Sequence, residues 1–73
     1  MASESVKSEI TGKVWKVVCE VGAEVAEEDS IMIIESMKME IPVLSPCAGR
    51  VVKLLVKEGD DVAEGQEVAV VEA

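Results

Sequence analysis

Apolar residues recur in short runs along the chain, and polar or glycine-containing stretches separate these runs. The first run alternates apolar and polar residues from position 5 to 10, and the second spans residues 13–19. Further runs occupy residues 31–34, 41–44, 50–56 and 68–71. Runs of this length, rich in Val and Ile and bounded by turn residues, are typical of β-strands. Residues 1–4 precede the first run, and we expect them to fray.

The segment from Glu35 to Glu40 connects two of these apolar runs near the middle of the chain. Two extended runs joined by a short polar connection predict a β-hairpin, with Met37 and Lys38 at its tip. Pro42 has no backbone N–H for strand pairing, so the outgoing strand is expected at a sheet edge or a bulge. A lysine on a hairpin tip is usually a solvated charge, but methionine on both sides makes this tip a small adhesive surface for a partner.

The two halves of the chain resemble each other. Sliding the chain on itself by 37 residues aligns Gly12 with Gly49 and Gly22 with Gly59, without a gap. Eight further pairs are identical at this offset, namely Val6–Val43, Ser8–Ser45, Val14–Val51, Lys16–Lys53, Val25–Val62, Ala26–Ala63, Glu27–Glu64 and Glu35–Glu72. A repeat of this length predicts two similar four-strand units, at about residues 5–36 and 42–73, related by a pseudo-twofold axis.

Each unit alone would leave an apolar face in water, so we expect the two units to pack together. The predicted fold is all-β: residues 1–73 form one domain, a flattened barrel or sandwich of two four-stranded antiparallel sheets. The shared glycines predict positions with a positive φ angle or a close approach of the backbone. The pseudo-symmetry places Lys38 at one end of the domain and both termini at the other.

The predicted core takes equivalent apolar positions from the two units. The members are Val14, Val17, Cys19, Val25, Ile31 and Ile33, with Val51, Leu54, Val56, Val62, Val68 and Val70 as their counterparts. Within each short strand, the choice of inward-facing residues is predicted only to within one position, because side chains alternate between the two faces of a sheet. Trp15 has Val52 as its counterpart and is predicted to be partly exposed, with stacking on a cofactor as an alternative.

Composition and charge restrict the classes of partner. The chain is 49% hydrophobic, with Trp15 as its one aromatic residue, so aliphatic side chains must build the core. Seven basic and 15 acidic residues give a net charge of −8. Such a surface repels phosphate backbones and anionic lipid headgroups, which disfavours nucleic-acid and membrane partners. Without a signal peptide or a run long enough to span a bilayer, we expect a cytoplasmic protein.

Several kinds of chemistry lack the residues they need. Cys19 and Cys47 are too few for a metal site, and the chain has no histidine to complete one or to activate a nucleophile. We expect both thiols to be reduced, and a disulfide between them is the alternative that the sequence leaves open. The carboxylates cluster in turn segments without an apolar pocket for acid–base work, and no glycine loop suits a phosphate. These residues predict a protein that another enzyme modifies, and not an enzyme.

The tip resembles the biotinyl-domain family, in which Ala-Met-Lys-Met or Val-Met-Lys-Met carries the biotinylated lysine. Here Ser36 precedes Met37-Lys38-Met39, a small residue in place of another small residue. Downstream, the family's Met-Glu, aliphatic residue, proline and glycine are matched by Met39-Glu40, Val43, Pro46 and Gly49. Because the two halves align without a gap, the chain resembles members that lack a protruding thumb, including short stand-alone biotin/lipoyl attachment proteins.

The resemblance implies a biotin carboxyl carrier with Lys38 as the attachment residue. Its ε-amine would attack biotinyl-adenylate held by a biotin protein ligase, which must supply the base because an ordinary lysine is protonated at pH 7. Family members then serve a biotin carboxylase and a carboxyltransferase, and supply no catalysis themselves.

The residues around Lys38 have expected roles as well. Met37 and Met39 are expected to be recognised by the ligase, with packing of one of them onto the barrel as the alternative. Glu35 and Glu40 flank the tip, and they either help the ligase to dock or keep the tip soluble.

Two other interpretations compete with the biotin carrier. A lipoyl carrier shares the fold but typically has Asp-Lys-Ala at its tip, so Met37 and Met39 argue against lipoate as the principal group. Some stand-alone attachment proteins accept both groups, and lipoate on Lys38 therefore stays open. An unmodified module used for protein contacts would need no lysine at the tip. The start at Met1 and the fit of the repeat to the length favour a free subunit or a cleanly cut domain.

Overall fold

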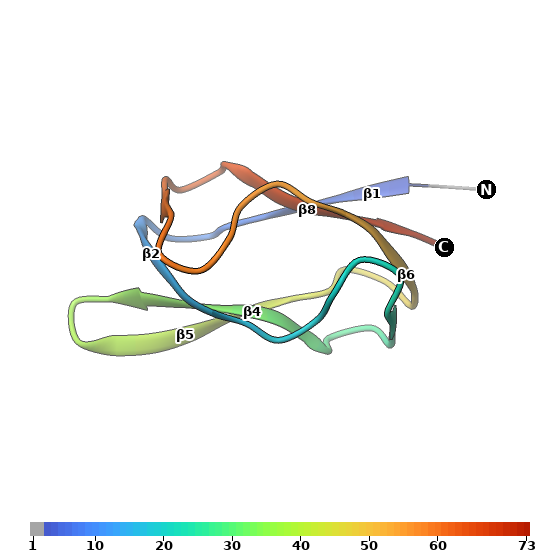
Figure 1. Cartoon of the computed structure of the whole chain (residues 1–73), viewed down its shortest axis with the longest axis horizontal. Coiled ribbons are helices and arrows are strands. Elements are labelled where there is room, and N and C mark those ends of the chain that lie inside the picture. The colour runs from blue at the N-terminus through green and yellow to red at the C-terminus, as the bar shows by residue number, and fades with distance from the viewer. Residues whose placement is uncertain (1–2) are drawn as a thin grey trace.

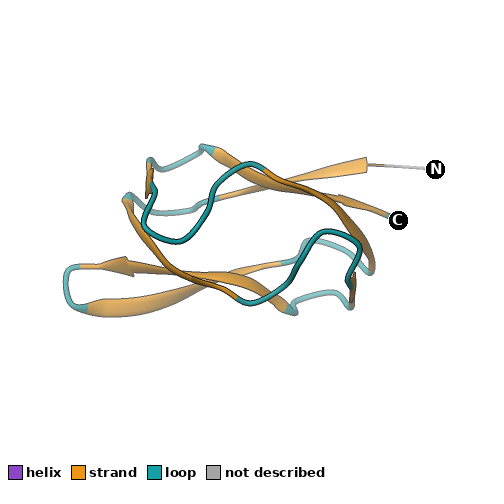
Figure 2. Ribbon diagram, in the orientation of Figure 1, coloured by secondary structure: helices purple, strands orange, loops and turns teal. Residues whose placement is uncertain are grey.

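Eight β-strands make up the computed structural model, which describes residues 3–73. The strands are β1 (Ser3–Lys7), β2 (Gly12–Val17), β3 (Glu24–Val25), β4 (Ser30–Ser36), β5 (Met39–Leu44), β6 (Gly49–Leu54), β7 (Asp61–Val62) and β8 (Glu67–Glu72). They pair into two antiparallel sheets, ordered β1-β8-β6-β3 and β5-β4-β2-β7, which lie face to face (Figures 1 and 2). The predicted all-β sandwich is confirmed. In the described part of the chain, no helix is long and apolar enough to cross a membrane.

The internal repeat is visible in the strand pairing. β6 and β7 begin and end 37 residues after β2 and β3, so the offset found in the sequence carries strand onto strand. The same offset carries the order β1-β8-β6-β3 onto β5-β4-β2-β7, and each sheet therefore contains strands from both halves. Neither half can bury its apolar face without the other, which explains why the two units form one sandwich. The connections that follow β2 and β6 are equal in length, as expected for a domain without a thumb.

Two identical serines fix the corners that follow β1 and β5. Ser8 and Ser45 are 1% and 2% exposed, although serine is usually found at the surface. Each hydroxyl donates a hydrogen bond of 2.6 Å to the carbonyl oxygen two residues later, that of Ile10 or Cys47. The buried hydroxyls are thus satisfied locally, and the same corner is built twice.

Two of the shared glycines have the positive φ angles expected of them. Gly22 has a φ angle of 96° and Gly59 one of 93°. Their amides donate hydrogen bonds across the pseudo-twofold axis, Gly22 to the Val51 carbonyl at 2.6 Å and Gly59 to the Val14 carbonyl at 2.8 Å. The turn of each half is therefore fastened to a strand of the other half.

Most of the predicted core is buried, but the prediction was wrong by one residue at two places. Ile33 and Val70 are half-buried, and their neighbours Ile34 and Val71 are fully buried instead. The cause is a β-bulge in each half. Pairing passes from Ser30 to Met32 on β4, and from Glu67 to Ala69 on β8, so Ile31 and Val68 are extra residues that reverse the inward-facing side.

The remaining core positions follow the prediction closely. The predicted residues that are buried are Val14, Val25, Ile31, Val51, Val56, Val62 and Val68, while Val17, Cys19 and Leu54 are half-buried and pack against them. Buried hydrophobic residues outside the prediction are Val6, Met32, Ile34, Val43, Ala69 and Val71. Cys19 and Cys47 are free thiols, so the alternative of a disulfide is not realised.

Some local expectations are confirmed and one is wrong. Trp15 is 47% exposed at a further bulge, where pairing passes from Val14 to Lys16. Pro42 lies on β5, which is an edge strand, as its missing N–H requires. Residues 3 and 4 do not fray, because Ser3 and Glu4 extend β1 and pair with β8. Residues 1 and 2 lie outside the described part of the chain.

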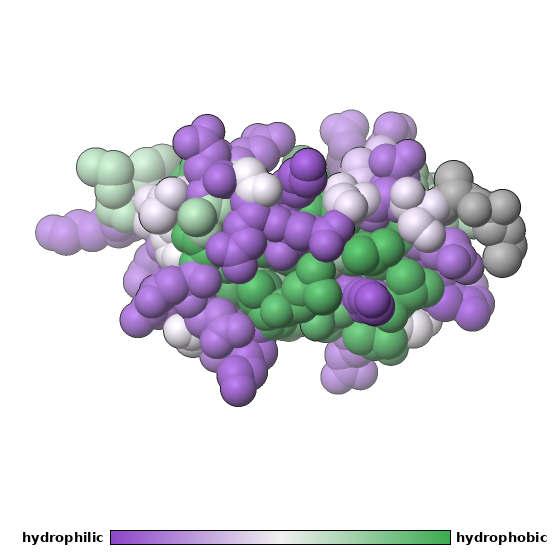
Figure 3. Space-filling model, turned by 90° about the horizontal axis from the view of Figure 1, so that it is seen from above, coloured by the Kyte–Doolittle hydropathy of each residue, from purple (hydrophilic) through white to green (hydrophobic). Residues whose placement is uncertain are grey.

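Apolar side chains are not confined to the interior. Partly exposed examples include Trp15, Val18, Val21 and Leu55, with exposed fractions between 47% and 59%. Figure 3 shows apolar side chains gathered over the middle of one face, with charged and polar side chains around them. The single aromatic residue and the net charge of −8 agree with this mixture of aliphatic core and acidic surface.

Candidate functional site

The hairpin predicted at the centre of the sequence is formed by β4 and β5. Their pairing runs from Ser30↔Leu44 to Ser36↔Met39, which leaves Met37 and Lys38 as a two-residue turn. The φ angles of these two residues are 51° and 67°. Positive φ at both central positions defines a type I′ turn, whose twist matches that of paired strands. The hairpin projects at one end of the domain, and Ser3 and Glu72 pair at the other end (Figure 1).

The residues of this turn are poorly suited to its geometry. Type I′ turns are usually built by Asn-Gly or a similar pair, because a Cβ atom makes positive φ angles unfavourable. For Met37 and Lys38 the cost is about 1–2 kcal/mol each. The six residue pairs of the β4–β5 ladder impose the conformation nevertheless. Local strain of this kind is typical of functional sites.

The side chains at the tip point into solvent. Met37 is 91% exposed and Met39 is 62% exposed, so neither packs back onto the sandwich. Lys38, Glu35 and Glu40 are exposed too, whereas Ser36 is half-buried at the base of the turn. The structure therefore brings together the lysine and both methionines, so that the charged amine of Lys38 lies between two exposed apolar side chains.

The charge around Lys38 is arranged on the strands below it. Glu35 and Glu40 are direct cross-strand partners, so two carboxylates stand side by side beneath the turn. Among residues 3–73, Arg50 and Glu24 form an ion pair at 3.5 Å, and no carboxylate lies within 4.0 Å of the Lys38 amine. The Lys38 amine is thus accessible. A partner that contacts it also approaches the carboxylates of Glu35 and Glu40 just below.

Gly12 lets β2 approach the base of the hairpin, a role that the sequence of the tip itself does not indicate. A Cβ atom at this position would lie 2.5 Å from the carbonyl oxygen of Glu35 and 2.8 Å from Cγ2 of Ile34. Ile34 is fully buried and anchors β4 in the core. The repeat gave the signal, because Gly12 and Gly49 are one of its identical pairs. Close packing here holds the turn on a rigid stem.

The two thiols add no chemistry to this site. Cys19 lies away from the hairpin tip, and its Sγ donates a hydrogen bond to the Ser30 carbonyl at 3.3 Å. Burial, and secondarily the charge of Asp29, raise the pKa of the Cys19 thiol. A reactive cysteine needs the opposite shift, so Cys19 is a packing residue.

Comparisons with known proteins agree with this geometry. The biotinylated protein TB7.3 homolog of Mycobacterium leprae is 42% identical over 69 residues, which are 94% of this chain and 97% of the relative. The biotin/lipoyl attachment protein of Bacillus subtilis is 39% identical over 61 residues, 84% of each chain. The crystal structure of Kluyveromyces lactis urea carboxylase matches with a TM-score of 0.93 and 43% identity.

These relatives differ greatly in length. The match covers 99% of this chain but 6% of the urea carboxylase chain, whereas the mycobacterial relative has nearly the same length as this chain. Residues 1–71 match the biotin/lipoyl family, which is described as "Biotin-requiring enzyme". Because this match spans nearly the whole chain and the fold agrees with that of the relatives, this chain belongs to the biotin/lipoyl family.

Proposed function

We propose that this protein is a biotin carrier and that Lys38 is its attachment residue. The observation that carries the proposal is the place of this lysine. It occupies the exposed two-residue turn of a family domain, between Met37 and Met39, at the end opposite the paired terminal strands. Six other lysines and arginines lie elsewhere in the chain, and none of them stands in a Met-Lys-Met sequence.

Attachment requires an external enzyme, for which we propose a biotin protein ligase. The Nζ atom of Lys38 attacks the acyl carbon of biotinyl-adenylate, an amide bond forms, and AMP leaves with the electrons of the broken acyl–phosphate bond. The amine must first lose a proton. Because Lys38 has no carboxylate within 4.0 Å among residues 3–73, the accepting base belongs to the ligase.

This chain contributes presentation. A turn fixed by a six-pair ladder holds the amine in one place, which lowers the entropic cost of reaching a productive geometry in the ligase. Met37 and Met39 offer flexible apolar contact surfaces on both sides of the lysine. Glu35 and Glu40 favour a basic rim on the partner, since complementary charges steer association.

The carrier role assigns no catalytic residue to this chain. When attached, biotin supplies the ability to hold and pass on a carboxyl group. The partners we propose are a biotin carboxylase and a carboxyltransferase, in a cytoplasmic carboxylase of which this chain is the non-catalytic part. The separation of Lys38 from the termini supports this arrangement, because a connection to other chains or domains would not obstruct the arm.

Intact-mass spectrometry tests the attachment residue directly. The protein is coexpressed with a biotin protein ligase, beside the variants Lys38→Ala and Lys57→Ala, both at exposed lysines. We expect one biotinyl increment on the parent and on Lys57→Ala, and none on Lys38→Ala. An unmodified parent, or an equal increment on Lys38→Ala, would refute the proposal.

Lipoate is the second candidate, because one relative is named as a biotin/lipoyl attachment protein. The same measurement with lipoate and a lipoate ligase separates the two groups, since their mass increments differ. We expect biotin to be attached faster, because the methionines at the tip match the biotinyl pattern, and because Met37 stands directly before Lys38 where the lipoyl pattern has Asp. Faster lipoylation would reverse the assignment.

A further inference from the structure

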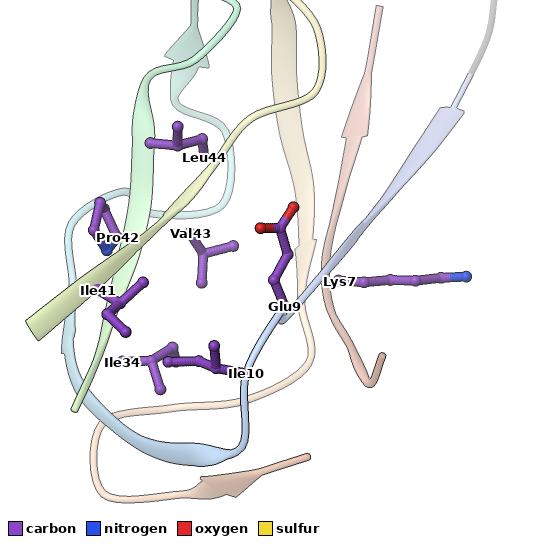
Figure 4. A pocket seen from close by; sticks show the side chains of 8 residues that line it. All are labelled: Lys7, Glu9, Ile10, Ile34, Ile41, Pro42, Val43 and Leu44. Atoms are coloured by element: carbon purple, nitrogen blue, oxygen red, sulfur yellow. The ribbon is translucent and has the colours of Figure 1, made fainter. Parts of the chain in front are cut away.

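An apolar groove opens beneath the hairpin, at the same end of the domain as Lys38. Its floor is formed by Ile10, Ile34, Ile41 and Val43, and its volume is about 140 Å³. Glu9 and Lys7 stand at its border. Figure 4 shows the three isoleucines gathered at one end of the groove, with the Glu9 carboxylate turned toward Val43 and the Lys7 side chain pointing away.

The groove exists because the hairpin reaches beyond the sheet that faces it. Ile34 and Ile41 are cross-strand partners, and Ile41 shares one face of β5 with the buried Val43. That face looks inward, but at the hairpin end the corner after β1, with Ile10, covers it only partly. The inner face of the hairpin thus continues the core out to the surface.

The repeat shows that the equivalent corner at the other end of the domain is built without these isoleucines. At an offset of 37 residues, Ile41 corresponds to Glu4 and Ile10 to Cys47. Both ends of the domain have the same strand pairing, yet isoleucine fills these two positions at the lysine end alone. A feature that one end has and the equivalent end does without is a candidate for function.

A biotinyl group on Lys38 can reach the groove. Ile41 lies three residues along the strand from Lys38, which corresponds to about 10 Å at 3.4 Å per residue. The extended arm from the lysine Cα to the biotin ring has about eleven bonds and spans roughly 14 Å. No movement of the hairpin is needed.

We propose that this groove is a resting seat for the biotinyl group, an inference that rests on the proposed attachment to Lys38. The ring and its aliphatic chain pack against the half-buried Ile10 and Ile41, above the buried Ile34. The ureido N–H groups donate hydrogen bonds to the Glu9 carboxylate, which accepts them at the border of the groove. The chemistry fits both parts of the ligand, because an apolar floor and one acceptor are what such a group requires.

The seat needs little intrinsic affinity. A short tether gives an effective concentration on the order of 1 mM, so a seat with a dissociation constant of about 1 mM is occupied roughly half of the time. An arm held this weakly is still released readily to a partner enzyme. The seat shelters an apolar group from water between encounters.

Methyl NMR spectroscopy tests the seat, and the five isoleucines of the chain supply their own controls. Ile10, Ile34 and Ile41 line the groove, whereas Ile31 is buried in the core and Ile33 is half-buried outside the groove. Spectra are compared for the unmodified protein and for protein whose mass shows one biotinyl group on Lys38. We expect shift changes and nuclear Overhauser effects to the biotin ring at the first three methyl groups, and none at the other two.

A pair of variants tests the role of Glu9. Glu9→Ala removes the acceptor and should lower the seated fraction about threefold or more, as expected when hydrogen bonds to a charged acceptor are lost. Glu27→Ala, at another exposed glutamate, should leave it unchanged. Both variants should carry biotin like the parent.

The outcomes separate the two proposals. Biotin on Lys38 with unchanged isoleucine methyl groups, or with equal shifts at all five, would overturn the seat and leave the carrier proposal intact. Equal seating in Glu9→Ala and Glu27→Ala would overturn the assigned acceptor. A protein that takes up no biotin at Lys38 would overturn both proposals.

Discussion

The two ends of the sandwich have the same strand pairing but different surroundings. At one end, β4 and β5 are joined by the Met37-Lys38 turn, and at the other, β8 pairs with β1 where the chain begins and ends. The repeat makes each end a control for the other. What both ends share is needed for the fold, as with the buried serines and the crossing glycines. What distinguishes the hairpin end is a turn with positive φ angles at two successive residues, the exposed methionines and an apolar groove, and these carry the proposed function.

The largest expected effect distinguishes two neighbouring isoleucines of β4. Ile34→Ala should lower the free energy of unfolding by about 3 kcal/mol, because it leaves a cavity in the core. Ile33→Ala should cost less than about 1 kcal/mol, because Ile33 is only half-buried. Urea unfolding monitored by circular dichroism measures both losses. Val71→Ala and Val70→Ala should repeat this order at the other end, and equal losses within either pair would refute the bulged register.

The bulges explain how far the sequence could predict the fold. Apolar runs and the 37-residue offset correctly predicted strands, sheets and a sandwich, because these depend on burial over many residues. The inward-facing side of β4 and β8 could not be read, because Ile31 and Val68 look like ordinary strand residues. Their status as extra residues depends on the partner strands, Met32 pairing with Val43 and Ala69 with Val6. The two-residue strands β3 and β7 lie in acidic segments. Their positions could not be predicted either, because they too depend on pairing with distant strands, β6 and β2.

The candidate site, too, could be predicted from the sequence only in part. The tip was predictable, since Met37, Lys38 and Met39 are consecutive in the sequence and lie between two strand-like runs. The groove was not, since Ile10 and Ile41 come from different segments and meet only after the sandwich has formed. Contacts within one hairpin leave a sequence signal, whereas contacts between the corner after β1 and the edge of β5 leave none.

A pair of glycine variants should affect the two ends differently. Gly12→Ala and Gly49→Ala place a Cβ atom against the carbonyl oxygens of Glu35 and Glu72, and each should cost about 1–3 kcal/mol of unfolding free energy. Gly12→Ala should also slow biotin attachment, because it displaces the stem of the hairpin. Gly49→Ala should leave the attachment rate of the folded protein unchanged. Initial rates with a biotin protein ligase, measured at a temperature where both variants are folded, make the comparison; equal rates would contradict the role of Gly12.

The strained turn allows stability and function to be separated. Met37→Asn should raise the free energy of unfolding by about 0.5–1 kcal/mol, because Asn tolerates positive φ angles better than Met. It should slow biotin attachment about tenfold, through loss of apolar contact with the ligase. Glu28→Asn is the matched control, since Glu28 has a φ angle of 72° and lies in another turn. It should stabilise the protein similarly and leave attachment unchanged, and a parent-like rate for Met37→Asn would show that the ligase ignores this side chain.

The smallest expected effect concerns Cys19, whose counterpart in the second half is Val56. Cys19→Val should change the free energy of unfolding at pH 7 by less than about 1 kcal/mol, because an aliphatic side chain fills the equivalent position. Burial, and secondarily the nearby Asp29, raise the pKa of the Cys19 thiol above its ordinary value in the folded protein. The folded state therefore holds this proton more tightly than the unfolded state does. Its contribution to stability is complete below the pKa of the unfolded thiol and is lost as the pH rises through the folded pKa.

Urea unfolding under reducing conditions at pH 7 and pH 10 measures this contribution. The parent should lose more stability than Cys19→Val between the two pH values, since valine has no proton to lose. All other residues are the same in the two proteins, so their effects cancel in the difference. An identical loss in the two proteins would mean that the Cys19 thiol has the same pKa in the folded and unfolded states. Cys19 would then behave as its counterpart Val56 does, without a pH-dependent contribution to stability.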